Sequence, residues 1–207
     1  MPDKIARWAA FASLPIAVVS AAVAFLGYQE TTKTNRLSSR LEARELLSSA
    51  LDMMGGAPGT ESFLLPGGAP DAETRRVLEL ARRKLDRALE LSPDFYLAHE
   101  YYGLYLHLTG DLEEALRFHE RAVELTEDDG WPYAAYANTL RSLGREADAV
   151  AALSSAIELN PRNPHFHRNL GLVLWDLGRR EDAEASFSNA RRLATLRGIA
   201  LTFPNDE

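Results

Sequence analysis

A 34-residue period constrains the fold of this 207-residue chain more than any other sequence feature. Gly110, Gly144 and Gly178 recur at this spacing, and three columns of alanine or leucine share it. The columns are Ala115, Ala149 and Ala183, then Ala122, Ala156 and Ala190, and finally Leu125, Leu159 and Leu193. Because four columns keep one period, we conclude that the chain contains structural repeats.

Each repeat divides at its glycine into two amphipathic runs, which predicts a pair of antiparallel helices. Asp128 or Asp129 is expected to cap the first helix of the middle repeat, with Pro132 in its first turn. Asn163 before Pro164 makes the same start in the next repeat. Helices that pack about 8–10 Å apart need small residues where they cross. Three first-helix positions supply them: Gly103, Ala137 and Gly171.

Three stretches, one in each repeat, resemble the tetratricopeptide repeat, a helix–turn–helix unit of 34 residues. They read YYGLYLHLTGDLEEALRFHERAVEL, ANTLRSLGREADAVAALSSAIELNP and NLGLVLWDLGRREDAEASFSNARRL. The resemblance implies an all-α solenoid with three full repeats, at residues 96–129, 130–163 and 164–197. The first of them carries Glu127 where the closing proline of the family usually falls.

A fourth repeat, degenerate or split, is predicted within residues 31–95. Its second helix is recognisable in VLELARRKLDRALELSPD, but a Gly- and Pro-rich loop at 55–71 occupies the place of its first helix. The apolar Phe-Leu-Leu of residues 63–65 in this loop would dock on the protein's own repeats or on a partner. The missing first helix is expected at 36–54, on an apolar stripe of Leu37, Leu41, Leu47, Leu51 and Met54.

Residues 1–30 are predicted to be an N-terminal transmembrane anchor. The 21 residues from Trp8 to Tyr28 carry no charge, and a helix of that length spans roughly 31 Å, close to the thickness of the hydrocarbon core. A signal peptide cleaved after Ala24 is the alternative. A ridge of small residues would pack against another membrane helix or simply face lipid. The ridge is formed by Ala9, Ser13, Ala17 and Ala21.

The location and orientation of the chain are expectations from its basic residues. Only three of the 23 basic residues are lysines, a bias typical of GC-rich bacterial genomes, so the expected membrane is a bacterial inner membrane. The basic residues that come after residue 28 favour a cytoplasmic solenoid by the positive-inside rule. The short segment that precedes the anchor favours export of the repeats. We expect a single-pass protein with periplasmic repeats, the cytoplasm being the alternative.

The resemblance further implies that the first helices line a concave groove that binds peptides or segments of partner proteins. The family pattern places twelve residues of this chain in the groove. They are Leu97, Glu100, Leu104 and His107, then Trp131, Ala134, Asn138 and Arg141, and finally His165, Arg168, Leu172 and Trp175. Tryptophan and arginine are typical anchors of protein interfaces. For Trp131, the alternative is that its ring merely covers the junction between two repeats.

Composition and motifs argue against catalysis and against several kinds of ligand. A net charge of −7 disfavours nucleic acid, and the absence of cysteine excludes disulfides and thiolate metal sites. His165 and His167 are two residues apart, about 200° around a helix, which is unsuitable for holding one metal ion. The other three histidines are expected on different faces of the first repeat: His99, His107 and His119. No phosphate loop or nucleophile motif is present, so we expect no enzyme, no cofactor and no metal.

These features together predict a membrane-anchored scaffold that binds protein partners and contacts the bilayer through residues 8–28. It would serve as an accessory or stabilising subunit of a larger membrane complex. The alternative is an assembly factor that holds clients during cytochrome c maturation or during envelope or pilus biogenesis. The C-terminal tail, residues 198–207, is too short for a capping helix, so either a partner covers the last repeat or the tail folds back over it.

Overall fold

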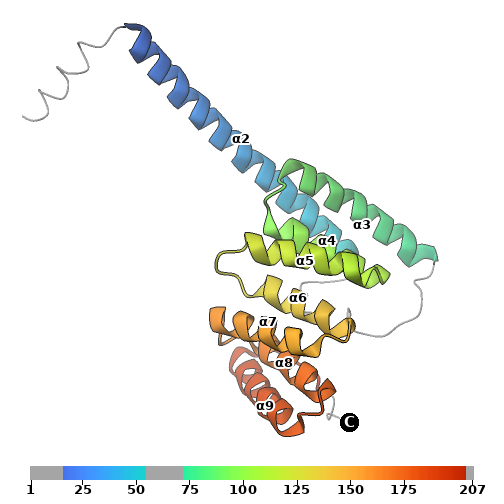
Figure 1. The fold of residues 1–207 in the computed structure, drawn as a ribbon. Coiled ribbons are helices and arrows are strands. Elements are labelled where there is room, and N and C mark those ends of the chain that lie inside the picture. Colours follow the sequence, from blue (N-terminus) through green and yellow to red (C-terminus); the bar gives the residue numbers. More distant parts are fainter. Residues whose placement is uncertain (1–15, 55–71, 204–207) are drawn as a thin grey trace, which may run out of the picture. The chain divides into compact units, whose positions relative to one another are not determined.

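A computed structural model describes residues 16–54 and 72–203, and of residues 16–23 and 72–75 it describes only the backbone. Within these ranges the chain forms eight α-helices and no strand (Figure 1). They are α2 (Ile16–Met54), α3 (Ala72–Leu91), α4 (Tyr96–Thr109), α5 (Leu112–Leu125), α6 (Trp131–Ser142), α7 (Glu146–Leu159), α8 (Pro164–Asp176) and α9 (Arg180–Arg197). The prediction of an all-α fold is confirmed.

The chain divides into two compact units, Met1–Leu41 and Glu42–Glu207. In the first unit α2 runs on past residue 30 without a break, and it exposes Phe25, Leu26 and Tyr28 by 59 to 68%. No helix in the described part of the chain is long and apolar enough to cross a membrane. Residues 8–15 of the predicted anchor lie outside the described ranges, as do Ala9 and Ser13 of its small-residue ridge. The other two members of the ridge, Ala17 and Ala21, fall in the part of α2 for which only the backbone is described.

In the second unit the helices stack in pairs that match the predicted repeats. The pairs α4–α5, α6–α7 and α8–α9 are each in close contact, and the second helix of one pair packs against the first helix of the next. The first helices also touch one another, because α6 contacts both α4 and α8. The three predicted full repeats are therefore confirmed as structural units.

The repeating glycines end the first helix of each pair in the left-handed conformation. Gly110, Gly144 and Gly178 have φ angles of 91°, 70° and 74°. Residues with a Cβ atom rarely adopt this region, whereas glycine adopts it without steric cost. The glycine column of the sequence thus marks the turn between the two helices of each repeat.

In the first and third repeats a glycine of the first helix faces a ring of the second helix. A Cβ atom added at Gly103 would lie 2.4 Å from the His119 ring, and one at Gly171 would lie 2.4 Å from the Phe187 ring. In the middle repeat, Ala137 stands at the position of the two glycines and Leu153 stands at the position of the two rings. Both residues are fully buried. The residues at the crossing are therefore matched in size within each repeat.

The predicted helix starts are confirmed at two junctions. Asp129, rather than Asp128, accepts a hydrogen bond from the backbone N–H of Trp131 on Oδ1, at 3.0 Å. Asn163 accepts one from the N–H of His165 on Oδ1, also at 3.0 Å, with Pro164 as the first helical residue. Both side chains satisfy a donor that the first turn of the following helix leaves free.

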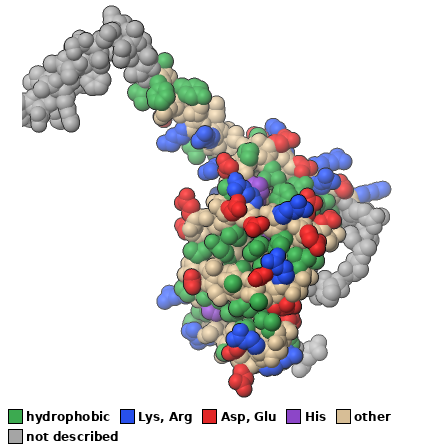
Figure 2. Space-filling model, viewed as in Figure 1, with side chains coloured by type: hydrophobic (Ala, Val, Ile, Leu, Met, Phe, Trp, Pro, Cys, Tyr) green, Lys and Arg blue, Asp and Glu red, His purple; other side chains and the backbone are tan. Residues whose placement is uncertain are grey.

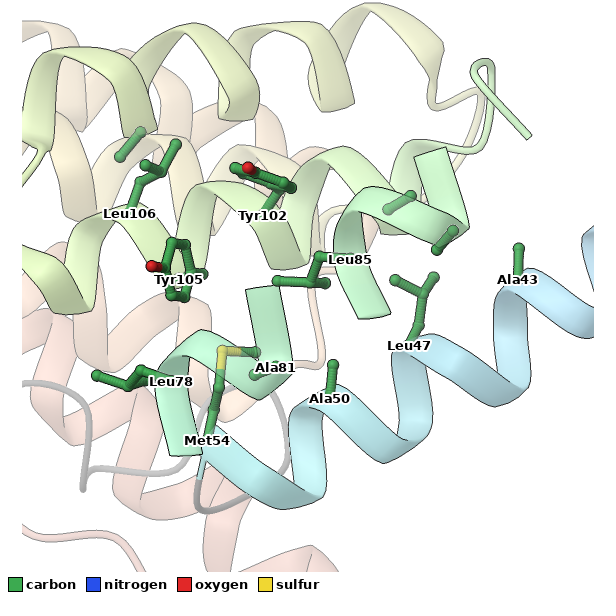
Figure 3. Packing of buried hydrophobic residues seen from close by; sticks show 13 residues of the cluster. Ala43, Leu47, Ala50, Met54, Leu78, Ala81, Leu85, Tyr102, Tyr105 and Leu106 are labelled. Atoms are coloured by element: carbon green, nitrogen blue, oxygen red, sulfur yellow. The ribbon is translucent and has the colours of Figure 1, made fainter. Parts of the chain in front are cut away.

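The C-terminal part of α2 shares an apolar cluster with α3, and the split repeat remains a prediction. Residues from α2, α3 and α4 meet in one apolar cluster (Figure 3). The predicted stripe is corrected in part, because Leu37 and Leu41 are 55% and 65% exposed. The buried side chains of α2 in this cluster are Ala43, Leu47, Ala50 and Met54. The loop 55–71 that would join the two helices, with its residues 63–65, lies outside the described residues.

The chain beyond α9 folds back onto the last repeat. Phe203 is buried, with its ring 5.6 Å from that of Phe187 and with the Arg191 guanidinium 4.2 Å above it. The carbonyl of Thr202 accepts a hydrogen bond from Nε of Arg168 on α8, at 2.7 Å. The segment thus contacts both helices of the last repeat, which confirms the prediction that the tail covers it.

Candidate partner-binding site

The twelve residues expected to line the groove lie on three neighbouring helices, α4, α6 and α8, and we call them the first-helix face. Nine are partly exposed: Leu97, Leu104, His107, Trp131, Asn138, Arg141, His165, Leu172 and Trp175. Three are buried: Glu100, Ala134 and Arg168. Ala134 therefore belongs to the packing between helices, Arg168 is bonded to the segment that follows α9, and Glu100 is a buried acid that is described below.

Trp131 lies at the junction between the second and third repeats. Its ring packs edge-to-face on Phe166, with 5.1 Å between centroids, and lies 5.6 Å from the ring of His165. The interpretation that Trp131 covers the junction is therefore correct. Its ring is nevertheless only partly buried, and its role in partner binding remains a prediction.

Trp175 is held in a similar way at the last repeat. The guanidinium of Arg180 lies 3.6 Å from the centre of its ring, and the Phe187 ring lies 6.4 Å away. Leu172 and Trp175 both pack against the same apolar cluster as Phe203. Both tryptophans of the first-helix face are thus fixed by neighbours, which lowers the entropy that a ligand would lose on contacting them.

Polar side chains of the first-helix face link each repeat to the next. Nδ1 of His107 lies 3.0 Å from Oγ1 of Thr139, and Arg141 forms an ion pair with Asp176. Arg168 donates to the carbonyl of Thr202. These pairs are separated by 32 to 35 residues, which is close to one repeat. Three residues predicted to contact a partner therefore already stabilise the stack, and a search for donors and acceptors one period apart would have found them.

Two of the three histidines of the first repeat converge, which corrects the expectation in part, whereas His99 lies apart at the carbonyl of Pro93. His107 and His119 converge on Thr139 of the following repeat, with Nδ1 of His119 2.9 Å from Oγ1 of Thr139. They meet because the first helix of the second repeat packs against both helices of the first. Burial, together with the nearby His107, lowers the pKa of His119 to about 3. Burial also lowers the pKa of His107.

Glu100 is the most unusual residue of the first-helix face. Glu100 is 4% exposed, and its Oε2 atom has no hydrogen-bond partner among the residues that the structure describes. Burial, and secondly the charge of Asp129, raises the pKa of Glu100 to about 8. Burial and Glu100 in turn raise the pKa of Tyr101 to about 12. Sequence reasoning placed Glu100 on this face but gave no signal that a charged neighbour, Asp129, lies beside it.

Asp129 holds its place through two hydrogen bonds. Its Oδ2 accepts from the hydroxyl of Tyr96 at 2.9 Å, and its Oδ1 accepts from the N–H of Trp131. Tyr96 begins α4 and Trp131 begins α6, so Asp129 ties the starts of two successive first helices together. We call Glu100 and Asp129 the acidic pair.

His165 and His167 have separate surroundings, as their spacing predicts. Nε2 of His167 lies 2.9 Å from the carbonyl of Pro161, whereas His165 contacts Trp131. Nε2 of His99, two repeats earlier, lies 2.7 Å from the carbonyl of Pro93 in the same relation. This histidine position therefore anchors a helix to the proline-containing turn before it. Within the described ranges, no three ligand-type side chains are grouped as a metal site.

Most other charges lie on the exposed side of the second helices. Acidic and basic side chains are interspersed over the visible face of the second unit (Figure 2). Many form short-range pairs such as Arg145–Asp148 and Arg179–Asp182, which recur one repeat apart. Exposed pairs of this kind contribute little to stability and serve mainly as a solvated surface. The buried side chain of Glu100 is therefore exceptional.

Comparisons with known proteins agree with this architecture. A family model described as Tetratricopeptide repeat matches residues 69–131, and one described as TPR repeat matches residues 137–178. No curated protein matches the chain.

Three solved structures are similar to the chain over part of its length. The chain is similar to YrrB, described as a TPR protein with an unusual peptide-binding site, at 23% identity and a TM-score of 0.48. This likeness covers 59% of our chain and 63% of YrrB, less than two thirds of that protein. A MamA RS-1 double mutant and a second MamA structure are each 19% identical, with TM-scores of 0.53 and 0.52. The two alignments cover 60% and 61% of our chain, and each covers 70% of the MamA chain.

At these identities the solved structures show the fold alone, whereas the family models match the repeats themselves. The matched ranges include α3 to α5 and most of α6 to α8. The chain therefore contains tetratricopeptide repeats, and repeats of this family form scaffolds for protein–protein interaction.

Proposed function

We propose that the protein is a membrane-anchored scaffold that binds a segment of a partner protein along its first-helix face. It acts as an accessory or stabilising subunit of a larger membrane complex and has no catalysis of its own. The observation that carries the proposal is the partial exposure of Trp131 and Trp175 on successive first helices, each ring held in place by its neighbours.

The chemistry of this face suits an interface with a protein segment. Two rigid aromatic rings provide apolar contact area at a small cost in side-chain entropy. The partly exposed Asn138 lies on α6 of the same face, and its amide can satisfy backbone groups of a bound segment. Leu97 and Leu104 extend the apolar surface along α4.

The membrane part of the proposal is supported by the sequence of residues 8–28. The run is uncharged, it has Trp8 and Tyr28 at its ends, and basic residues come after it. We propose a bacterial inner membrane, with the repeats in the periplasm. Alkaline carbonate extraction of membranes tests the anchor: the protein should stay in the pellet, and release into the supernatant would contradict the proposal.

Capture from detergent-solubilised membranes tests the scaffold. The full-length chain, purified in mild detergent, should recover a partner at constant stoichiometry, identified by mass spectrometry. Trp131→Ala should reduce this recovery by about tenfold or more, since truncation of an aromatic anchor typically costs over 1 kcal/mol of binding free energy. Leu159→Ala, a change at an exposed position of the second helix α7, should leave recovery unchanged.

The circular dichroism spectrum of each variant must match that of the wild type, so that lost binding is not lost folding. Equal recovery by Trp131→Ala would remove this residue from the binding site. Recovery that is substoichiometric and sensitive to salt would favour the assembly-factor alternative, in which clients bind only transiently.

A further inference from the structure

We propose that the acidic pair, Glu100 and Asp129, binds a lysine or arginine side chain of the partner segment. This inference rests on the proposed function, because it names the chemistry of the segment that lies on the first-helix face. Glu100 lies on that face, and Asp129 is hydrogen-bonded to the backbone of Trp131, the aromatic residue that we assign to the same interface.

The first argument is the unsatisfied state of Glu100. A buried carboxyl group without a hydrogen-bond partner loses its hydration, and no hydrogen bond within the protein compensates for that loss. Oε2 of Glu100 is in this situation, and the charge that acts on the side chain is that of another acid, Asp129. A cation placed between the two carboxylates would satisfy both groups at once.

The second argument is that the repeat does not need a carboxylate at the position of Glu100. The equivalent residues are Ala134, fully buried in the second repeat, and Arg168, which is bonded to Thr202 in the third. An alanine therefore fills the same place in the stack without any polar group. The acid of the first repeat is an addition to the fold and not a requirement of it.

The third argument concerns Asp129. Its counterpart one repeat later is Asn163, which caps α8 through the same type of hydrogen bond that Asp129 makes to α6. A neutral amide thus performs the capping as well as a carboxylate does. The negative charge of Asp129 is not needed for the cap, and it opposes the ionisation of Glu100.

The pair is suited to a cation in its hydrogen-bonding capacity as well as in its charge. Each oxygen of Asp129 already accepts one hydrogen bond, from Tyr96 or from Trp131, and a carboxylate oxygen can accept a second. Asp129 is partly exposed, so a side chain that approaches from solvent meets it first. An ammonium group has three N–H donors and a guanidinium group has five, so one cation can donate hydrogen bonds to both Asp129 and Glu100.

Selection from a random peptide library tests the inference. The full-length protein in mild detergent is immobilised and used to select from displayed 12-residue peptides. The wild type should enrich lysine or arginine at one position of the selected peptides, next to apolar residues. Glu100→Gln and Asp129→Asn should keep the apolar preference and lose the basic one, whereas Glu113→Gln, an exposed acid of the same repeat, should keep both.

One selected peptide is then measured by fluorescence anisotropy with its basic residue replaced by norleucine, which keeps the chain and removes the charge. The replacement should weaken binding to the wild type by about 10- to 100-fold, the usual effect of a charge-assisted hydrogen bond. It should change binding to Glu100→Gln by less than about threefold. Gln is isosteric with Glu and, like the protonated form of Glu100, carries no charge, so the variant should fold, and circular dichroism checks this.

The outcomes separate this inference from the function on which it rests. Selected peptides that bind in a Trp131-dependent way, but show no basic preference or keep it in Glu100→Gln, would overturn the inference and leave the scaffold intact. Failure of the wild type to select any peptide would count against the binding face itself and would overturn both.

Discussion

Glu100 and His119 are buried groups whose protonation differs between the folded and the unfolded chain, so both make stability depend on pH. The pKa of Glu100 is about 8 in the folded protein, against an ordinary value of 4.5. Between these values the unfolded chain releases a proton that the folded chain keeps, so the free energy of unfolding falls as the pH rises. The shift corresponds to a loss on the order of 4 kcal/mol across this window.

Glu100→Gln should remove this fall in the free energy of unfolding with rising pH, because the amide of glutamine cannot ionise. We expect the difference in unfolding free energy between variant and wild type to grow in favour of the variant from pH 4.5 to 8. Urea unfolding of the full chain, followed by circular dichroism at several pH values, measures it. Glu113→Gln is the matched control, and parallel pH profiles for wild type and Glu100→Gln would contradict the assignment.

His119 acts in the opposite direction. Its pKa is lowered from 6.5 to about 3, so the unfolded chain takes up a proton that the folded chain refuses as the pH falls through this window. His119→Leu, which copies Leu153 of the next repeat, should reduce the loss of stability between pH 6.5 and 3. The gain should be absent at pH 8, and acid-induced unfolding curves of both proteins test it.

Single residues were predictable where one helix or one turn determines their role. The start of α8 at Asn163 and Pro164, and the divergence of His165 and His167, result from local geometry. The contact of His107 and His119 with Thr139 does not, since three helices of two repeats must pack before these side chains meet.

At the scale of elements, the helix crossings show how the repeat tolerates different side chains. A ring on the second helix is matched by glycine on the first, as in Gly171 and Phe187, whereas Leu153 is matched by Ala137. The repeat pattern predicted small residues at these positions. Glycine stands where the facing side chain is a planar ring, His119 or Phe187, and alanine stands opposite a leucine, a match that only the packed pair shows.

Gly171→Ala should destabilise the protein by about 1–3 kcal/mol, because the new methyl group would lie 2.4 Å from the fully buried ring of Phe187. The double variant Gly171→Ala, Phe187→Leu copies the middle repeat and should recover part of this loss. Thermal and urea unfolding of both variants measure the coupling.

Gly27→Ala, at a helix position with open space around it, is the control for the backbone effect of the substitution and should not lower stability. A Gly171→Ala variant as stable as the wild type would show that the crossing can open to admit a methyl group.

Helix α2 shows what periodicity predicts about an element and what it does not. The sequence indicated a helix at 36–54, and α2 covers this range. The predicted stripe of buried leucines is wrong at two positions. Leu37 and Leu41 are exposed, and both lie in the first unit. Ala43 and Ala50 are buried because they pack in one apolar cluster with side chains of α3 and α4 (Figure 3).

At the scale of the whole molecule, a stack of repeats is stabilised by contacts between neighbours, so its end is its weakest part. Phe203 covers the last repeat through Phe187 and Arg191. Phe203→Ala should therefore destabilise α8 and α9 more than α4 and α5, with a cost on the order of 3 kcal/mol for a buried ring.

Hydrogen exchange of the full chain, resolved by mass spectrometry, distinguishes the two regions. Faster exchange confined to α8 and α9 is the expected result. Leu196→Ala, at a position that is 74% exposed, should change nothing. Uniformly faster exchange in all helices would show that the stack unfolds as one cooperative unit and that its end is not separately weak.

The sequence by itself determined the repeat, its length, its turns and its small positions, because each depends on local geometry that recurs every 34 residues. It also predicted the split repeat and the residues of the first-helix face. Only the tertiary structure decided which of those residues are available to a partner. Arg168 is bonded to the segment after α9, and His107 and Arg141 already bond to the next repeat, because neighbouring segments pack closely enough to pair these side chains.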